Sequence, residues 1–420
     1  MTAVSSPPDL GLRSTELSNG LTVLSEHMPG VRSVAFGAWV RAASVHERRE
    51  QMGVSHLLEH MVFKGTRNRS ARDIALSLEV LGGSLDAYTA REHTSFQARV
   101  LDEHLVEAAD VIGDLIFRPL LRREDLLLER KVVLEEIGMV DDTPDDLVFE
   151  LQNEALWGAH PYGYSILGTR ETVSALGVRE LQALHERAYH PSQIVVACAG
   201  NVSHELLLDA LSRTGWNDLP AGNAARLTTP PAVPAAPTRR HVDRDSAQTH
   251  IVFGSTAVPH HDPRRYAVAL VDTILGGGMS SRLFQRVREE LGLAYAVHTF
   301  QSFHPDTGVC GVYVGTSPET ADEATAAIDA ELDRLAAESL SDDEIAAGKS
   351  QLKGQVTLSL ESVSSRMFRA AGVALYEEPY RSLEETLALI DAITPHTVAE
   401  ICAEFYPSSR QTVLSLGPTP

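Results

Sequence analysis

The chain has 420 residues with 43% apolar and 22% charged side chains, a balance that excludes disordered, collagenous and membrane-spanning classes. At about 100–200 residues per domain, this length predicts two or three domains. The net charge of −21 argues against nucleic acid as a partner, because an acidic surface repels phosphate groups.

The first predicted elements are two strands. Asn19-Gly20 is a turn signal, and an apolar run at 21–24 follows it directly. A second run at 34–40 is apolar and contains β-branched and aromatic residues, as buried strands do. Both runs are interpreted as strands that open the N-terminal half.

Residues 51–65 contain the most informative motif, His56-x-x-Glu59-His60. Apolar residues at 54, 57, 58, 61 and 62 predict a buried helix, with Gly65 as its terminator. His56 and His60 then lie on one helix face and can bind one metal ion together. Glu59 falls on the same side, where it can reach a water on that metal. The alternative is a coincidental pair of histidines on a polar helix face.

A catalytic tetrahedral zinc needs a third protein ligand, and the best candidate lies at 123–138. Apolar residues at 126, 127, 133, 134 and 137 predict a largely buried helix. Glu129 and Glu136 differ by only about 20° around its axis. Glu135 is turned by about 100° from Glu136, so Glu136 rather than Glu135 accompanies Glu129. The alternative is a solvated acidic helix face.

A proline-rich segment separates two similar halves of the chain. Its prolines exclude a helix or a central strand and predict an interdomain linker. The second half again opens on an apolar run, at 249–253, and long amphipathic helices at 105–117 and 321–335 occupy similar places. This weak duplication predicts two α+β domains. The expected boundaries are 1–216 for the N-terminal domain, 217–240 for the linker and 241–420 for the C-terminal domain.

The cysteines and the N-terminal segment indicate a compartment. Cys198, Cys310 and Cys402 are scattered and without CxxC spacing, as is typical of reduced core thiols in a cytosolic protein. Residues 1–20 hold no apolar stretch of the kind found in a secretory signal. No run approaches the roughly 18 apolar residues of a membrane span. We therefore expect a cytoplasmic protein with no membrane partner.

Together, the inverted HxxEH motif and the later Glu-x6-Glu helix resemble the pitrilysin/insulinase family of zinc peptidases, in its processing-peptidase-like subgroup. Two further segments agree with this family. Residues 82–94 resemble its substrate-binding edge strand, and residues 276–295 resemble the segment that holds the Arg/Tyr pair of its second domain. The resemblance spans nearly the whole chain and keeps the order of all four motifs.

The resemblance implies two homologous α+β domains of the LuxS/processing-peptidase-like metallohydrolase type, each a mostly antiparallel sheet packed with helices. It implies a zinc-dependent endopeptidase that cleaves extended or unfolded peptides and holds one zinc per chain. Larger family members join four such domains into a chamber, so the two domains of this chain imply a homodimer with sites shared between chains.

The resemblance also implies roles for the metal-site residues. His56, His60 and Glu136 would hold zinc. Glu59 would act as general base toward a zinc-activated water, and Glu129 would orient a ligand from behind.

Substrate contacts are implied for both domains. Arg288 and Tyr295 would donate hydrogen bonds to the substrate carbonyl or its oxyanion. The strand would pair with the substrate backbone. Its site residues are Ser84, Asp86, Ala87, Tyr88 and Thr89. The family often has Asn where this chain has Asp86, and a carboxylate cannot donate the amide hydrogen bond.

The same family fold also serves as non-catalytic subunits that bind peptides or scaffold larger complexes. Such chains lose zinc ligands. Here the three candidate ligands, the candidate base and the Arg/Tyr pair are all present, which favours the enzyme over the scaffold.

Overall fold

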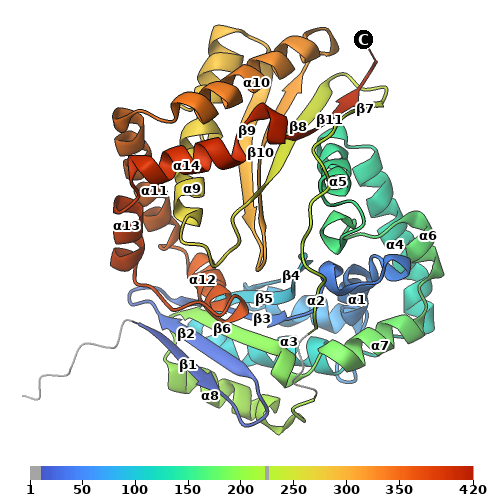
Figure 1. The fold of residues 1–420 in the computed structure, drawn as a ribbon. Coiled ribbons are helices and arrows are strands. Elements are labelled where there is room, and N and C mark those ends of the chain that lie inside the picture. The colour runs from blue at the N-terminus through green and yellow to red at the C-terminus, as the bar shows by residue number, and fades with distance from the viewer. Residues whose placement is uncertain (1–10, 223–226, 420) are drawn as a thin grey trace, which may run out of the picture. The chain divides into compact units, whose positions relative to one another are not determined.

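The computed structural model describes residues 11–222 and 227–419 (Figure 1). Residues 1–10, in the segment expected to lack a secretory signal, and residues 223–226 of the expected linker lie outside the described residues. The chain forms two compact units. The first contains the described parts of Met1–Ile137, Ser165–Thr229 and Ser359–Tyr380, and the second those of Gly138–Tyr164, Pro230–Leu358 and Arg381–Pro420.

A six-stranded sheet forms the centre of the first unit, in the order β1-β2-β6-β3-β5-β4. β2 and β6 run parallel, and the other neighbours are antiparallel. β3 is buried along nearly its whole length, which explains its uninterrupted apolar sequence. The strand bounds are Leu12–Glu16 (β1), Thr22–His27 (β2), Ser33–Val40 (β3), Ser84–Thr89 (β4), Thr94–Leu101 (β5) and Ile194–Gly200 (β6).

Helices cover both faces of this sheet (Figure 1). Val34 and Phe36 of β3 join one core cluster with residues of α1, α3 and α8. Ala35 and Trp39 join the other, where α12 packs against β2, β3 and β6. This alternation is the two-residue period of a strand. The helices of the first unit are α1 Val54–Val62, α2 Ala71–Glu79, α3 Leu105–Phe117, α6 Arg170–Ala175, α7 Val178–Ala188, α8 His204–Arg213 and α12 Val363–Leu375, together with α4 Arg123–Asp141, which belongs to this unit as far as Ile137.

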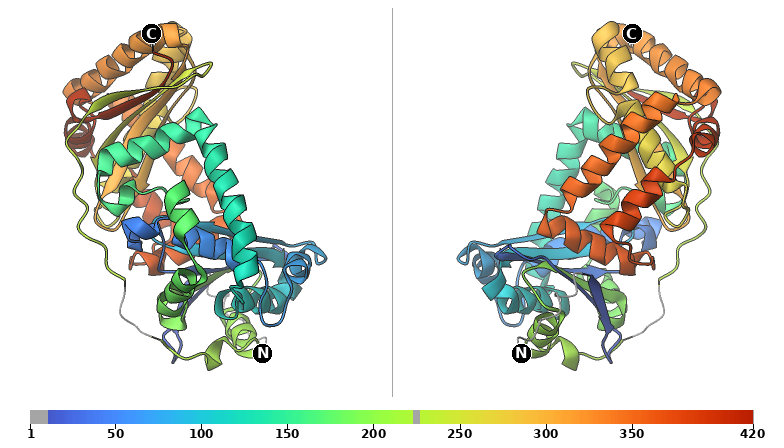
Figure 2. Two further views of the ribbon diagram at one scale, coloured as in Figure 1. Left: turned by 90° about the vertical axis from the view of Figure 1, so that its right-hand side faces the viewer. Right: turned by 90° about the vertical axis from the view of Figure 1, so that its left-hand side faces the viewer.

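A five-stranded sheet forms the centre of the second unit, in the order β7-β11-β8-β10-β9. Only β7 and β11 run parallel among these neighbours. α5 packs against β8 and β11 (Figure 2). The strands are β7 Arg239–Asp243, β8 Thr249–Ala257, β9 Ala294–Phe303, β10 Gly308–Thr316 and β11 Thr412–Gly417. The helices are α5 Pro144–Trp157, α9 Arg265–Gly276, the π-helix η7 Phe284–Glu290, α10 Ala321–Glu338, α11 Asp342–Ser359, α13 Leu383–Asp391 and α14 Pro395–Phe405.

The two sheets share one topology. β2-β6-β3-β5-β4 in the first unit corresponds strand by strand to β7-β11-β8-β10-β9 in the second, and in each the single parallel pair comes first. This confirms the expected fold of two homologous α+β domains with mostly antiparallel sheets. Each sheet is also covered by a helix from the other half of the sequence, namely α12 on the first sheet and α5 on the second. The boundaries at 217–240 stay a prediction.

Several elements differ in length from their expected ranges. The helix expected to end near Gly65 ends at Val62, because the next two N–H groups take the tighter three-residue bonds to the carbonyls of His60 and Met61. The strand expected at 249–253 continues to Ala257. The described residues of 219–238 form neither helix nor strand. Within the described part of the chain, every helix is too short or too polar to cross a bilayer.

Candidate metal centre

The start of α1 is fixed by a buried carboxylate and a glycine. Gly53 has a φ of +86°, and a Cβ there would meet the carbonyl oxygen of Leu167 at 2.5 Å, so only glycine suits this position. The backbone N–H groups of Gly53 and Ser55 donate to the Glu47 carboxylate, each at 2.8 Å. Burial raises the pKa of this carboxyl to about 7. These contacts set where the helix begins and hence which way its polar face points.

The structure brings His56 and His60 of α1 together with Glu136 of α4. Each offers one ligand atom, and the three atoms lie within 4.8 Å of one another. Glu136 Oε2 lies 3.7 Å from His56 Nε2 and 3.5 Å from His60 Nε2. Among the described residues, no other group of three His, Cys, Asp or Glu side chains meets so closely.

The cluster fits a zinc ion in its donor atoms and in the two separations that join Glu136 to the histidines. Zinc binds imidazole nitrogen and carboxylate oxygen at about 2.0–2.2 Å in a tetrahedron, which places neighbouring ligand atoms about 3.3–3.6 Å apart. The separations of 3.5 and 3.7 Å are close to that range. Glu136 Oε2 is also buried, with no hydrogen-bond partner in the described part of the chain. A buried carboxylate oxygen in this state is costly unless a cation compensates it.

The protonation of His56 suits metal binding. Burial, and secondarily the neighbouring His60, lowers the pKa of His56 to about 4. The imidazole is therefore neutral at neutral pH, the form that binds a metal. The two rings are close, with centroids 4.6 Å apart.

Glu59 lies on the same helix but outside the three-atom cluster. Its side chain is nearly buried, and Thr89 Oγ1 of β4 donates a hydrogen bond to Glu59 Oε2 at 2.6 Å. Burial raises the pKa of Glu59 and nearby Glu136 adds to the rise, whereas the Thr89 bond and His60 lower it. A buried carboxylate whose pKa is raised is a stronger proton acceptor than an exposed one, and this one lies on the same helix as two candidate metal ligands.

Glu129 lies behind the cluster, on the same face of α4 as Glu136. Its Oε2 lies 3.3 Å from His60 Nδ1, and its Oε1 lies 2.7 Å from Lys64 Nζ. Sequence reasoning singled out Glu129 but missed Lys64. The signal was present, since Lys64 follows His60 by one helical turn, the same spacing that joins His56 to His60.

β4 contains the candidate substrate strand and forms one edge of the first sheet. Among the described strands it pairs with β5 alone, so its other side has backbone N–H and C=O groups that none of them covers. Ser84 and Asp86 are exposed, while Ala87 and Tyr88 are partly buried. Thr89 connects this strand to α1, the helix that contains His56 and His60, through its hydrogen bond to Glu59.

Arg288 and Tyr295 meet each other in the second unit, whereas the metal-site residues belong to the first. The Arg288 guanidinium lies between two rings, 4.5 Å from the centroid of Tyr295 and 4.6 Å from that of Phe284. Its Nη1 donates to the backbone oxygen of Tyr295 at 3.1 Å. The Tyr295 residue is 77% exposed.

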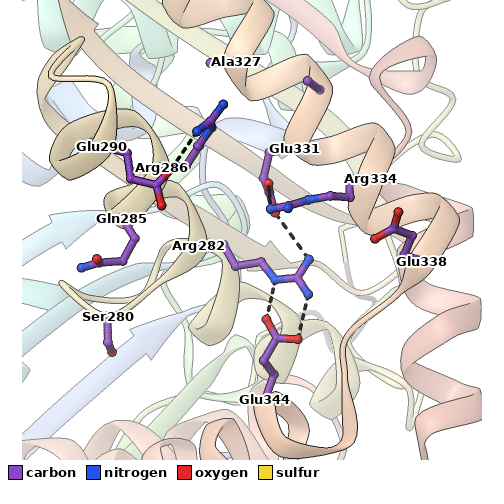
Figure 3. Close-up of a pocket in the computed structure, with 11 residues that line it drawn as sticks. Ser280, Arg282, Gln285, Arg286, Glu290, Ala327, Glu331, Arg334, Glu338 and Glu344 are labelled. Carbon is purple, nitrogen blue, oxygen red and sulfur yellow. Dashed lines mark hydrogen bonds and ion pairs between the residues drawn. The ribbon is translucent and has the colours of Figure 1, made fainter.

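A polar pocket lies beside η7, the π-helix that contains Arg288, and Gln285, Arg286 and Glu290 of this helix line it (Figure 3). Its central Arg282 forms ion pairs with Glu344 at 2.6 Å and Glu331 at 3.4 Å. These pairs hold the start of the π-helix against α10 and α11. The ion pairs in this pocket therefore help to hold the segment that contains Arg288 in place.

The fold and the His-His-Glu cluster define the class of zinc peptidases, and comparison with known proteins gives the family. Residues 22–170 match the model described as insulinase (peptidase family M16), and residues 175–352 match that of the peptidase M16 inactive domain. The first match contains the candidate metal ligands, and the second contains Arg288 and Tyr295. The chain belongs to peptidase family M16, the insulinase family, which confirms the resemblance.

Individual relatives agree along nearly the whole chain. An uncharacterized zinc protease of Streptomyces coelicolor is 37% identical, over 97% of this chain and 90% of its own length. An uncharacterized zinc protease of Bacillus subtilis is 36% identical, over 92% of this chain and 94% of its own length. Two solved structures share the fold, each with a TM-score of 0.90. The peptidase M16 inactive domain from Pseudomonas fluorescens is 21% identical, and the match covers 98% of this chain and 99% of that one. A protease from Helicobacter pylori is 19% identical, and the match covers 97% of this chain and 99% of that one.

Proposed function

We propose that this protein is a zinc-dependent endopeptidase that cleaves extended or unfolded peptides, with one zinc per chain held by His56, His60 and Glu136. The observation that supports it most is the meeting of these three ligand atoms beside a buried carboxylate, Glu59, on the same helix. The relatives named zinc proteases support both the metal and the chemistry.

Each residue has a separate task in this mechanism. His56, His60 and Glu136 would hold the zinc, which would supply Lewis acidity toward a substrate carbonyl and a water molecule. Glu59 takes a proton from this water on its carboxylate and passes it to the leaving amine. Thr89 holds Glu59 in orientation through its 2.6 Å hydrogen bond. Glu129 accepts the Nδ1–H of His60 and leaves Nε2 free to bind the metal.

The free edge of β4 is the proposed substrate platform. A peptide that adds to this edge is recognised through its backbone, so extension matters more than sequence. Ser84, Asp86, Ala87, Tyr88 and Thr89 would flank that peptide. Asp86 would contribute only acceptor oxygens to it, which disfavours acidic side chains nearby.

Cleavage should require an unfolded substrate, because a folded protein rarely offers a free strand edge. The test uses one small disulfide-bonded domain in two forms, native and permanently unfolded by reduction and alkylation. We expect cleavage of the alkylated form and negligible cleavage of the native form, measured by mass spectrometry. Efficient cleavage of the native domain would contradict strand pairing, and binding without cleavage of the unfolded form would identify a non-catalytic subunit.

We further propose a homodimer in which Arg288 and Tyr295 of one chain complete the metal site of the other. Tyr295 is 77% exposed and the Arg288 side chain is 33% exposed, so both can reach a group outside their own unit. A twofold arrangement makes two equivalent shared sites.

Mixing two inactive variants tests this sharing. Glu59→Gln and Tyr295→Phe are each expected to be inactive alone. In a shared-site dimer, each mixed dimer has one doubly altered and one intact site, so random exchange should restore about a quarter of all sites. The measurement is peptide cleavage after exchange, with exchange itself followed by native mass spectrometry. An inactive mixture after proven exchange would contradict shared sites and leave the zinc chemistry unaffected.

We also propose a cytoplasmic location and no nucleic-acid partner. Cys198, Cys310 and Cys402 are free and buried, as expected where thiols stay reduced. The net charge of −21 disfavours contact with phosphate backbones.

A further inference from the structure

The turn after α1 contains a cation that the mechanism above does not use. Lys64 Nζ lies 2.7 Å from Glu129 Oε1, and the other oxygen of Glu129 lies 3.3 Å from His60 Nδ1. Lys64, Glu129 and His60 form a continuous row of contacts from solvent to the candidate zinc ligands. Exposure falls from 36% for the Lys64 side chain to 7% for Glu129, so the carboxylate is buried and the ammonium is not.

The backbone of this turn is fastened to α4 as well. The carbonyl oxygen of Lys64 accepts a hydrogen bond from Arg122 Nη2 at 3.0 Å. Arg122 in turn pairs with Asp125, in the first turn of α4, at 2.7 Å. The Lys64 side chain then reaches Glu129, one turn further along α4. Two contacts therefore fix the lysine relative to the helix that contains the candidate ligand Glu136.

The two histidines differ in what lies behind them. His56 Nδ1 is buried and has no hydrogen-bond partner among the described residues. His60 Nδ1 faces Glu129, and such a carboxylate fixes the tautomer and the orientation of a ligating imidazole. The arrangement thus places the Nδ1–H of His60 toward Glu129 and its Nε2 toward Glu136, 3.5 Å away.

We propose that Lys64 is a positioning residue of the zinc site: by binding one oxygen of Glu129, it keeps the other aimed at His60 Nδ1. This inference rests on the proposed function of the cluster as a zinc site. Glutamate has three rotatable side-chain bonds, and a partner on each oxygen leaves the carboxylate one orientation. Without Lys64, the His60 contact is the only one of these side-chain contacts within the described part of the chain that still orients Glu129, so the imidazole is held less firmly.

Charge alone predicts the opposite effect. A cation close to a dication site repels the metal, so its removal should strengthen zinc binding if Lys64 only contributes charge. Loss of positioning should weaken zinc binding instead. The sign of the change therefore distinguishes the two roles.

The experiment measures zinc affinity by competition with a chromophoric chelator, using the full chain. We expect Lys64→Met to weaken zinc binding by about tenfold, the lower end of the range for groups that surround a metal site. Lys64→Arg keeps a cation in reach of Glu129 and should stay within about twofold of wild type. Lys131→Met is the matched control, since Lys131 is an exposed lysine of α4. Thermal unfolding of each zinc-free variant checks that the fold is intact.

A double-mutant cycle separates positioning from a general structural effect. If Lys64 acts through Glu129, Lys64→Met should change zinc affinity by less than about twofold in a Glu129→Gln background. The proposal would be overturned, while the zinc site stands, if the losses of zinc affinity in the two single variants add in the double variant. It would also be overturned if Lys64→Met leaves zinc affinity unchanged or raises it. Wild-type protein that binds no zinc would overturn the proposed function, and this inference with it.

Discussion

Glu59→Gln should leave the zinc content at about one ion per chain while peptide cleavage falls by about 10²–10⁴-fold, the usual contribution of a general base. The amide keeps the size of the side chain and can still accept the hydrogen bond from Thr89 Oγ1. It cannot accept a proton from water. The metal ligands are untouched, because Glu59 lies outside the three-atom cluster of His56, His60 and Glu136.

The measurements are zinc content by elemental analysis and turnover of a flexible fluorogenic peptide. Glu50→Gln is the matched control, because Glu50 is an exposed glutamate just before the same helix. It should retain both zinc and activity. Loss of zinc together with activity in Glu59→Gln would make Glu59 a ligand and overturn its assignment as base.

The local parts of the fold were predictable because each is encoded in a short stretch of sequence. β2 and β3 follow from the apolar runs at 21–24 and 34–40, and the helical period of α4 predicts the buried positions Leu126 and Val133. Leu127 was expected on the same buried face but is 48% exposed, because the buried residues of α4 recur every three or four positions and form a single narrow stripe. The weak duplication predicted two similar domains, and the common strand order of the two sheets confirms it.

The exchange of helices between the two halves was not predictable. α12 covers the first sheet through Val363 and Met367, which lie more than 300 residues along the chain from β2. A helix with one apolar face looks the same in sequence whichever sheet buries it. Periodicity therefore predicts that such a helix packs but not where it packs.

The candidate metal site, like the fold, could be predicted only in part. Helical spacing indicated that His56 and His60 share one face and that Glu129 and Glu136 share another, and the structure brings these faces together. Contacts between elements were not predictable from spacing. Thr89 reaches Glu59 from β4 across a sheet edge, and Glu47 binds the start of α1 from a preceding loop. Such contacts depend on the packing of segments that no local pattern relates.

Glu136→Gln should weaken zinc binding by more than about a hundredfold, beyond the range for groups that only surround a metal site, because it removes the carboxylate ligand. Glu135→Gln makes the same chemical change one residue earlier. Glu135 is exposed and turned by about 100° around α4, so zinc affinity and turnover should both stay within about twofold of wild type. The measurement is chelator competition on both variants, with thermal unfolding of the zinc-free proteins as the check on folding. If Glu135→Gln loses the metal and Glu136→Gln keeps it, the face of α4 that meets His60 is misassigned, and the pairing of Glu129 with Glu136 must be abandoned.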